Sequence, residues 1–461
     1  MFNRVTQSIV KEMDPKGDRD LVPVHSSFKH EHFKLLCLVT RKKKNVFHPF
    51  HCYRRTWYKL DDILLPGKYS NSTESLFPSG GSQDAKTFTI KQNTCDRVDG
   101  SLNLSVATTS LELNGVASLS KEWSIKLEKK HIEVSKLEPL RTERRINMNH
   151  SFIQQLRKKQ HKLYVVCETL ETSEETSYEE SSKAEGSLMA QLYTKFCAKG
   201  TRESEQSITI PKGCTVAFSA IQLVIEDKPW DPGCFQSITV RSTVPGPVQR
   251  KLSTRAAPSE GNLGALEEEV KWNCQILSML SSDLAVIVLK AIKAAMRDRK
   301  LFQELTQRMQ ALLDETASCE LETQSPDLKD LLSSLQRCPR DPLLELSEAI
   351  TYALDALDEL TMDQLLLLLE SLEEKIVSQQ LQLVKSILEH NLDNKEGRFS
   401  VDASLLSFSQ ERKEKLTIVM VEMSGVKLQK DGSAVYAEAA FSAMAALYVS
   451  LYVLNLLSNS D

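Results

Sequence analysis

The amino-acid sequence predicts an α+β domain with a twisted antiparallel sheet, followed by an all-α domain. Between residue 33 and about residue 225, apolar and polar side chains alternate at every second position, as in half-buried strands. After about residue 264 the apolar residues recur with a helical period of about 3.6 residues. Residues 228–263 contain five prolines and three glycines, a composition typical of a linker. We therefore expect domains at residues 1–230 and 263–461, joined by a linker at 231–262.

The first domain is expected to begin with a short amphipathic helix. Val5, Ile9 and Val10 share one face of residues 4–13, and the helix should end at Asp14-Pro15-Lys16-Gly17 because Pro and Gly break helices. A second, basic helix is predicted at residues 151–162. Strand-like alternation is clearest in three segments, 102–106, 123–127 and 208–218.

The second domain is expected to be a compact set of helices. Asp327 and Asp341-Pro342 are suitable helix starts, and the segment Thr417–Val421 is predicted to be a short strand. Apolar stripes opposite charged faces occur in five segments: 265–280, 283–305, 341–357, 361–376 and 381–392.

An uncharged run from Ala439 to Leu457 is long enough to cross a bilayer. Ser442, Ser450 and Asn455 lie inside the run, and no Lys or Arg follows it. These features favour a helix buried among other helices. A tail anchor is the alternative, and it predicts carbonate-resistant membrane association of the intact chain.

The two halves carry opposite charge, although the whole chain has a formal net charge of only −4. Residues 1–240 contain 35 Lys and Arg against 29 Asp and Glu, whereas residues 241–461 contain 23 against 33. Such a split suits a basic half that binds an anionic surface and an acidic half that masks it. Two unrelated domains of different charge are an equally good interpretation of the charge alone.

The sequence contains no recognisable catalytic or metal motif. There is no GxSxG, Walker A, HExxH or GxGxxG pattern. His48, His51 and Cys52 lie close together, but Pro49 and the neighbouring Arg and Lys residues disfavour a cation. We therefore predict no catalytic residue, cofactor or metal. The N-terminus lacks a signal peptide and the ten cysteines include no CxxC pair, which predicts reduced thiols in the cytoplasm.

Two basic clusters are the strongest functional signal. The first, Arg41–Lys44, precedes an aromatic loop that contains Phe47 and Phe50. Cations beside exposed aromatic side chains suit a membrane interface, and nucleic acid is the second possibility. The third possibility is a solvated loop whose aromatic tip packs on another domain. A further cluster contains Arg144, Arg145, Arg157 and Lys158, and Arg4 and Lys11 of the first helix could join the same face.

The ordered set of motifs resembles the gasdermin family along nearly the whole chain. In the first half the resemblance is carried by Asp14–Asp18, Leu21–Val24, Cys37–Lys42, Asp62–Gly67, Leu163–Leu170, Ile208–Gly213 and Ala217–Ile225. Cys167 stands where the family usually has Thr. In the second half it is carried by Leu381–Glu389 and Ala446–Leu451. The resemblance also favours a buried final helix over a tail anchor.

The resemblance implies an autoinhibited pore-forming protein. A protease would cut the linker, after which the N-terminal domain would bind acidic phospholipids, oligomerise and form a large β-barrel pore that causes pyroptotic lysis. The implied partners are phosphoinositides, cardiolipin and phosphatidylserine, the activating protease, other copies of the cleaved chain and the intramolecular C-terminal domain, with no nucleic acid. The intact chain would be cytoplasmic, and the cleaved one would lie at the plasma membrane, with organelle membranes as a second possibility. Segments 86–106 with 116–134, and 163–192 with 195–218, could form its membrane hairpins.

The resemblance also suggests roles for particular residues. Phe47 and Phe50 would form the membrane tip and would dock on the C-terminal domain in the intact chain. Cys197 would be a possible acylation site, although an ordinary thiol is the more frequent case. The expected lipid-binding residues are Arg4, Lys11, Arg41, Lys42, Lys43, Lys44, Arg144, Arg145, Arg157 and Lys158.

Two questions stay open at the level of sequence. The activating protease cannot be named. Pro232 after the linker's Asp231 would block most caspases, and the caspase-like segment Val224–Asp227 abuts the last predicted strand, whereas Arg250, Lys251 and Arg255 would suit a trypsin-like enzyme. We expect cleavage within residues 232–262. A lipid-binding adaptor that docks on membranes without forming pores is the alternative function. Dye release from liposomes distinguishes the two, because an adaptor would bind without leakage.

Overall fold

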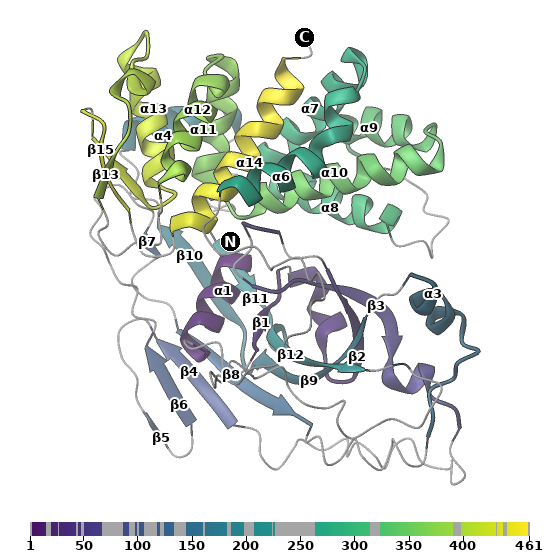
Figure 1. The fold of residues 1–461 in the computed structure, drawn as a ribbon. Helices are drawn as coiled ribbons and strands as arrows, with labels where there is room; N and C mark the ends of the chain where they lie inside the picture. Colours follow the sequence, from purple (N-terminus) through teal and green to yellow (C-terminus); the bar gives the residue numbers. More distant parts are fainter. Residues whose placement is uncertain are drawn as a thin grey trace, which may run out of the picture.

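A computed structural model describes most of both predicted domains. The described residues are 2–14, 20–25, 27–42, 45–47, 50–66, 86–91, 97–98, 101–105, 118–119, 124–132, 144–159, 162–181, 186–197, 207–223, 225, 263–313, 323–390, 398–429, 431–436 and 440–459. The expected linker at 231–262 lies outside these residues. In Figure 1 the helical C-terminal half lies across one end of the sheet-containing N-terminal half.

A twisted, mainly antiparallel sheet forms the centre of the N-terminal half. Its main path runs β1-β12-β9-β8-β4-β6-β5, and β2 pairs with both β9 and β3. The pair β4–β6 is parallel. The strands are β1 (Val22–Pro23), β2 (Cys37–Arg41), β3 (Tyr53–Lys59), β4 (Lys86–Lys91), β5 (Arg97–Val98), β6 (Ser101–Ser105), β8 (Ser124–His131), β9 (Leu163–Thr172) and β12 (Thr215–Leu223).

Helices cover the two faces of this sheet. Helix α1 (Phe2–Met13) buries Val5, Ile9 and Val10 against strands β1, β2 and β12, so the predicted amphipathic helix is confirmed. Helix α3 (Ser151–Lys159) buries Ile153 and Leu156 on the opposite face, and this confirms the predicted basic helix. Short 3-10 helices, η1 (Ser27–Phe33) and η2 (Leu60–Ile63), flank β2 and β3.

A second, three-stranded sheet connects the main sheet to the helical half. It has the order β11-β10-β7, formed by β7 (Ser118–Leu119), β10 (Thr176–Ser181) and β11 (Ser207–Ile210). Helix α4 (Gly186–Phe196) lies between β10 and β11 in the chain and packs on α11 of the helical half. In the intact chain, therefore, part of the expected hairpin 163–192 with 195–218 is a helix.

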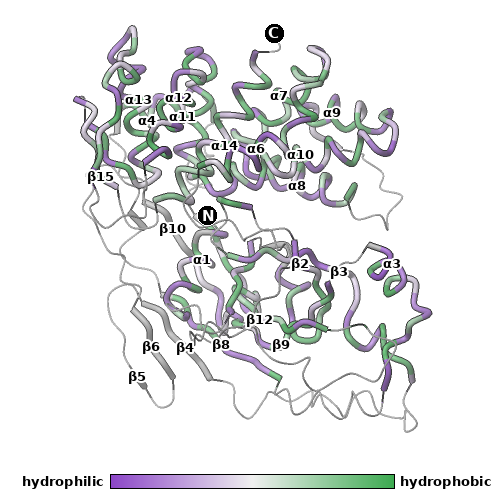
Figure 2. The backbone as a smooth tube through the Cα atoms, viewed as in Figure 1, coloured by the Kyte–Doolittle hydropathy of each residue, from purple (hydrophilic) through white to green (hydrophobic). Residues whose placement is uncertain are grey.

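The C-terminal half is mostly helical, as predicted, and apolar residues alternate with hydrophilic ones along most of its helices (Figure 2). The elements are α6 (Leu263–Cys274), η4 (Gln275–Met279), α7 (Ser282–Arg297), α8 (Arg299–Leu313), α9 (Pro326–Gln336), α10 (Arg340–Asp358), α11 (Met362–Glu373), α12 (Val377–Glu389), η5 (Ala403–Leu406), α13 (Glu411–Glu422) and α14 (Ala440–Ser458). Asp327 and Asp341 lie in the first turns of α9 and α10.

Helix α14 is the single described helix that is long and apolar enough to cross a membrane, but 72% of its apolar window is buried. It packs against α10, α12 and α7 in the middle of the helical core. The prediction of a buried final helix is therefore confirmed.

The predicted strand at Thr417–Val421 is wrong, because these residues lie inside α13. Leu416, Thr417, Met420 and Val421 are buried at helical spacing, so packing outweighs the local preference of β-branched residues for strands. The C-terminal half does contain a small sheet, in the order β13-β15-β14. It is formed by β13 (Arg398–Ser400), β14 (Val426–Leu428) and β15 (Ser433–Tyr436).

Candidate functional site at the domain interface

The loop after β2 inserts an aromatic side chain into the helical half. Phe47 has no exposed surface and belongs to the hydrophobic cluster of the C-terminal helices. Its ring meets the ring of Tyr352 on α10 edge to face, with centroids 5.4 Å apart. Such a pair adds about 0.5–1.5 kcal/mol to the burial of the phenyl group.

Glu269 on α6 fixes the position of this loop. The backbone N–H of Val46 donates to both of its carboxylate oxygens at 3.1 Å, and the Tyr352 hydroxyl donates to Oε1 at 3.1 Å. Burial and the neighbouring Glu269 raise the pKa of Tyr352, so the hydroxyl keeps its proton and remains a donor. One carboxylate thus holds both the loop backbone and the ring that contacts Phe47.

Helix α4 makes a second contact between the halves. Leu188, Met189 and Leu192 are buried in the same cluster as the C-terminal helices. The hydroxyl of Tyr193 donates to Asp363 Oδ1 at 2.9 Å, inside the interface. The ring of Phe196 lies under the guanidinium of Arg297 on α7, 5.7 Å from its centroid.

Lys195, near the C-terminal end of α4, adds ion pairs to this contact. Its Nζ lies 2.6 Å from both Glu370 and Glu373 on α11, and the Glu370 side chain is only 1% exposed. Burial alone would lower the pKa of Lys195, but hydrogen bonds and attraction from the two carboxylates outweigh it and raise the pKa. Arg412 on α13 pairs with Glu370 at 2.5 Å, so the buried carboxylate has two cationic partners.

Polar contacts complete the interface beside α1 and β2. Asn3 Nδ2 donates to Glu359 at 3.1 Å, and Gln7 Nε2 donates to both Glu359 oxygens at 3.2 Å. Lys42, the residue after β2, forms an ion pair with Asp355 on α10. In each of these contacts the N-terminal half supplies the donor and the C-terminal half supplies the carboxylate.

The predicted lipid-binding residues occupy different environments. Lys11, Arg145, Arg157 and Lys158 are exposed, and so is Arg41, whose Nη2 lies 2.6 Å from His51 Nε2. Lys42 is held at the interface, as described above. Lys43, Lys44 and the side chain of Arg4 lie outside the described residues.

Arg144 has structural contacts in the intact chain. Its Nη1 pairs with Asp61 at 2.9 Å, and its Nε donates to the carbonyl of Leu65 at 3.0 Å. These contacts tie the segment before α3 to the end of η2.

Comparison with known proteins gives the family. A model described as the gasdermin pore forming domain matches residues 1–237, and one described as the gasdermin PUB domain matches residues 262–435. This chain belongs to the gasdermin family. Its pore-forming domain is therefore the α+β half, and the matched helical domain is the one that covers it.

Mammalian gasdermins align along the whole chain. Mouse gasdermin-A3 is 31% identical, with 100% of this chain and 98% of the relative covered. Mouse gasdermin-A is 30% identical with both chains fully covered, and human gasdermin-D is 27% identical over 99% of this chain and 98% of its own length. A solved structure of the gasdermin A3 membrane pore matches at 24% identity and a TM-score of 0.34, covering 52% of this chain and 96% of that chain.

The gasdermin interface separates the two phenylalanines of the loop. Phe47 lies in the helical domain, whereas the partly buried Phe50 packs on the core of its own sheet, beside α1 and β12. Of the two rings expected to dock on the helical domain, Phe47 packs on it and Phe50 packs on the sheet, and an inhibitory role of either contact stays a prediction. Phe50 lies three residues before the start of β3, where the chain has already turned back to the sheet.

The contribution of α4 was not anticipated. Leu188, Met189 and Leu192 have the i, i+1, i+4 spacing of a helix face, which was the available signal. Cys197, the expected acylation site, directly follows α4 and is partly buried against the helical domain in the intact gasdermin.

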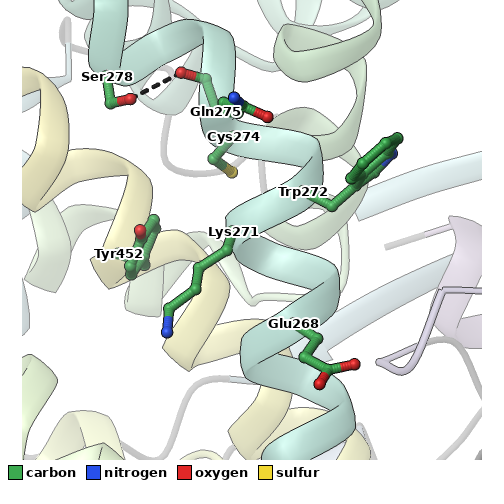
Figure 3. A pocket seen from close by; sticks show the side chains of 7 residues that line it. All are labelled: Glu268, Lys271, Trp272, Cys274, Gln275, Ser278 and Tyr452. Atoms are coloured by element: carbon green, nitrogen blue, oxygen red, sulfur yellow. Dashed lines mark hydrogen bonds between the residues drawn. The ribbon is translucent and has the colours of Figure 1, made fainter.

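The helical domain also carries an open groove of about 520 Å³, lined by Glu268, Lys271, Trp272, Cys274, Gln275, Ser278 and Tyr452. In Figure 3, Lys271 lies near Tyr452 from α14, whereas Trp272 points to the other side of α6. Burial raises the pKa of the Cys274 thiol to about 12, so this thiol is protonated and a poor nucleophile at neutral pH. Among the described residues, no group of three or more His, Cys, Asp or Glu side chains could hold a metal ion.

Proposed function

We propose that this gasdermin is held inactive by its own helical domain and is released by cleavage within residues 232–262. The released domain, expected at residues 1–230, then binds acidic phospholipids, oligomerises and forms a β-barrel pore, which causes pyroptotic lysis. The observation that carries the proposal is the burial of Phe47 and of the apolar face of α4 among the C-terminal helices. Apolar groups that serve at a membrane must be covered in a soluble chain.

The charges of the interface support the same proposal. Lys42, expected to bind lipid headgroups, is paired with Asp355 in the intact chain. Lys195 is likewise held by two glutamates. In the intact chain the acidic domain therefore pairs with cations that would otherwise contact lipid headgroups. Docking on the helical domain and docking on lipid compete for the same side chains.

The test is cleavage at a protease site inserted into the linker, followed by dye release from vesicles with and without phosphatidylserine, phosphoinositide or cardiolipin. We expect leakage only after cleavage and only with acidic lipid. The uncut chain and a cut chain supplied with excess helical domain are the controls. Binding of the cut chain without leakage would instead favour the adaptor.

The lipid-binding assignment needs its own variants. Reversing the exposed charges Arg157 and Lys158, or Arg41, should weaken flotation of residues 1–240 on acidic vesicles. Arg144 is less suitable for this test, because its ion pair with Asp61 makes its loss a folding defect as well. Unchanged flotation of the charge-reversed forms would remove these residues from the lipid site.

Cys197 is proposed as an acylation site that becomes accessible when α4 leaves the helical domain. Its partial burial in the intact chain supports an order in which cleavage comes first. Mass spectrometry of the chain from cells before and after cleavage tests this. An adduct at equal occupancy in both states would contradict the order, and no adduct would remove the site.

A further inference from the structure

A thiol, an imidazole and an amide follow one another beside the domain interface. The Sγ atom of Cys52 lies 3.6 Å from Nε2 of His25 and 3.9 Å from the carbonyl oxygen of Phe50. The other ring nitrogen of His25, Nδ1, lies 2.7 Å from Oδ1 of Asn3 on α1. Asn3 Nδ2 in turn donates to Glu359 of the helical domain at 3.1 Å. The order thiol, imidazole, amide is the one that activates the nucleophile of thiol proteases.

Backbone contacts of the sheet domain hold this trio in place. His25 follows β1, and the Thr6 hydroxyl on α1 donates to the carbonyl of the preceding Val24 at 2.9 Å. The backbone N–H of Lys42 donates to the carbonyl of Cys52 at 2.9 Å, which joins the end of β2 to the start of β3. The positions of the thiol and the imidazole are therefore set by the fold of the sheet and α1.

The carboxylate of Glu359 decides which tautomer His25 adopts. A carboxylate only accepts hydrogen bonds, so it faces the NH₂ group of Asn3 and leaves the amide oxygen toward His25. Gln7 Nε2 donates to the same amide oxygen at 3.2 Å. Nδ1 of His25 therefore carries a proton, and in the neutral ring Nε2 is the acceptor that faces the thiol of Cys52.

The charges of the helical domain favour transfer of the thiol proton to His25. Burial alone would raise the pKa of Asp358, but attraction from Arg299 and then from His25 outweighs it and lowers the pKa, so Asp358 is ionised. Arg299 pairs with Asp358 at 2.5 Å and offsets part of its charge. An imidazolium at His25 is therefore stabilised by Asp358 on one side and by a thiolate at Cys52 on the other.

We propose that Cys52 is a reactive thiol that small hydroperoxides oxidise while the two domains are docked. The thiolate attacks one oxygen of hydrogen peroxide, so an S–O bond forms and the O–O bond breaks. The leaving hydroxide takes the proton from His25 and departs as water, and Cys52 becomes a sulfenic acid. The sulfur gives up two electrons, which the peroxide gains. Cys52 is only 6% exposed, which suits a reagent of this size and excludes a peptide.

The dependence on docking rests on the proposed function, in which the domains separate after cleavage. Without Glu359, Asn3 loses the acceptor that fixes its amide, and either ring nitrogen of His25 can then carry the proton. The negative charge of Asp358 is lost as well. Cys52 should therefore react faster in the intact chain than in the released domain. Simple uncovering of a buried thiol predicts the opposite order.

The first experiment treats the intact chain with hydrogen peroxide and traps the sulfenic acid with dimedone as the chain is denatured. Mass spectrometry then gives the oxidation rate of each cysteine. We expect Cys52 to react about tenfold faster in the wild type than in His25→Gln, because an ordinary thiol is only a few per cent ionised at pH 7. His131→Gln, which removes an imidazole from the end of β8, should leave the rate unchanged. Equal rates in the wild type and His25→Gln overturn the proposal.

A pH profile separates a chemical role of His25 from a packing role. In His25→Gln the rate should rise about tenfold per pH unit between about pH 6.5 and 7.5, as for an ordinary thiol. In the wild type it should rise much less, because His25 already takes the proton. Parallel profiles would mean that His25 only fills space beside Cys52, and the proposal would fail.

The wild type alone provides a test that does not depend on the folding of a variant. Cys338 is more exposed than Cys52, and its thiol donates to the carbonyl of Ser334 at 3.4 Å. Exposure alone therefore predicts faster oxidation of Cys338, whereas activation by His25 predicts faster oxidation of Cys52. Faster oxidation of Cys338 overturns the proposal.

The link to docking is tested in the intact chain with two interface variants. Glu359→Gln removes the carboxylate that holds Asn3 and should slow the oxidation of Cys52 about threefold or more. Glu373→Gln removes an interface carboxylate that pairs with Lys195 and should leave the rate unchanged. Equal effects of the two variants would refute the link. Neither result depends on pore formation, because leakage by the cleaved chain is measured separately and decides the proposed function alone.

Discussion

Phe47 and Phe50 lie only three residues apart, yet they pack on different domains. The ring of Phe47 is completely buried against Tyr352, and that of Phe50 is half-buried on the sheet. A variant of each residue therefore tests a different contact of the same loop. The comparison isolates the docking of the loop from the stability of the domain that carries it.

We predict that Phe47→Ala releases the inhibition and that Phe50→Ala does not. Truncating a buried phenyl group costs about 3–5 kcal/mol, and at Phe47 this cost falls on the contact between the domains. Uncut Phe47→Ala should leak dye from acidic vesicles more than the uncut wild type does. Thermal unfolding of both variants is the control. Equal leakage from the two uncut variants would show that loop disturbance, and not loss of the Tyr352 contact, releases the domain.

The cysteines allow a prediction about pH. Burial raises the pKa of Cys167 to about 11 and that of Cys214 to about 12. Because the thiolate is the reactive form, both should be alkylated slowly by iodoacetamide at pH 8, and faster as the pH rises toward these values. Mass spectrometry of the native chain gives the rates site by site. Rapid labelling of Cys214 at pH 7 would contradict the burial that the structure gives it.

At the scale of single elements, the sequence predicts best where the signal is local. Val5, Ile9 and Val10 show the face of α1, and Ile153 and Leu156 show that of α3, because each helix buries one stripe on one sheet. The strand prediction for Thr417–Val421 is wrong because its β-branched residues are buried inside a helix. The interface was only half predictable: Phe47 has a local signature, whereas the role of α4 depends on a partner that lies about 170 residues further along the chain.

Helix α4 provides a test of that long-range contact. Lys195→Glu would place a third carboxylate beside Glu370 and Glu373, and Lys195 is partly exposed, so we expect docking to weaken by roughly 1–2 kcal/mol. Uncut Lys195→Glu should leak more than the wild type. Adding Glu373→Lys restores an opposite-charge pair and should reduce leakage again. A double variant that leaks as much as the sum of the single ones would mean that the two residues do not interact.

At the scale of the whole molecule, the net charge of −4 conceals a basic domain held by an acidic one. The interface shows how that difference is used. Glu269, Asp355, Glu359, Asp363, Glu370 and Glu373 all come from the helical domain and accept donors from the sheet domain. Long-range electrostatic attraction between the domains and the hydrogen bonds and ion pairs at the interface therefore both favour the docked arrangement.

This arrangement predicts how the two halves behave after the linker is cut in the absence of membrane. Phe47 and the apolar face of α4 still join the halves, so they should co-elute on size exclusion at low salt. The attraction between the oppositely charged domains is screened as the Debye length falls from about 10 Å at 0.1 M salt to about 3 Å at 1 M. The dissociation constant of the cut pair should therefore rise roughly tenfold over this range. A constant that is independent of salt would mean that apolar burial alone holds the domains together, and that the charge split matters only for the encounter with a membrane.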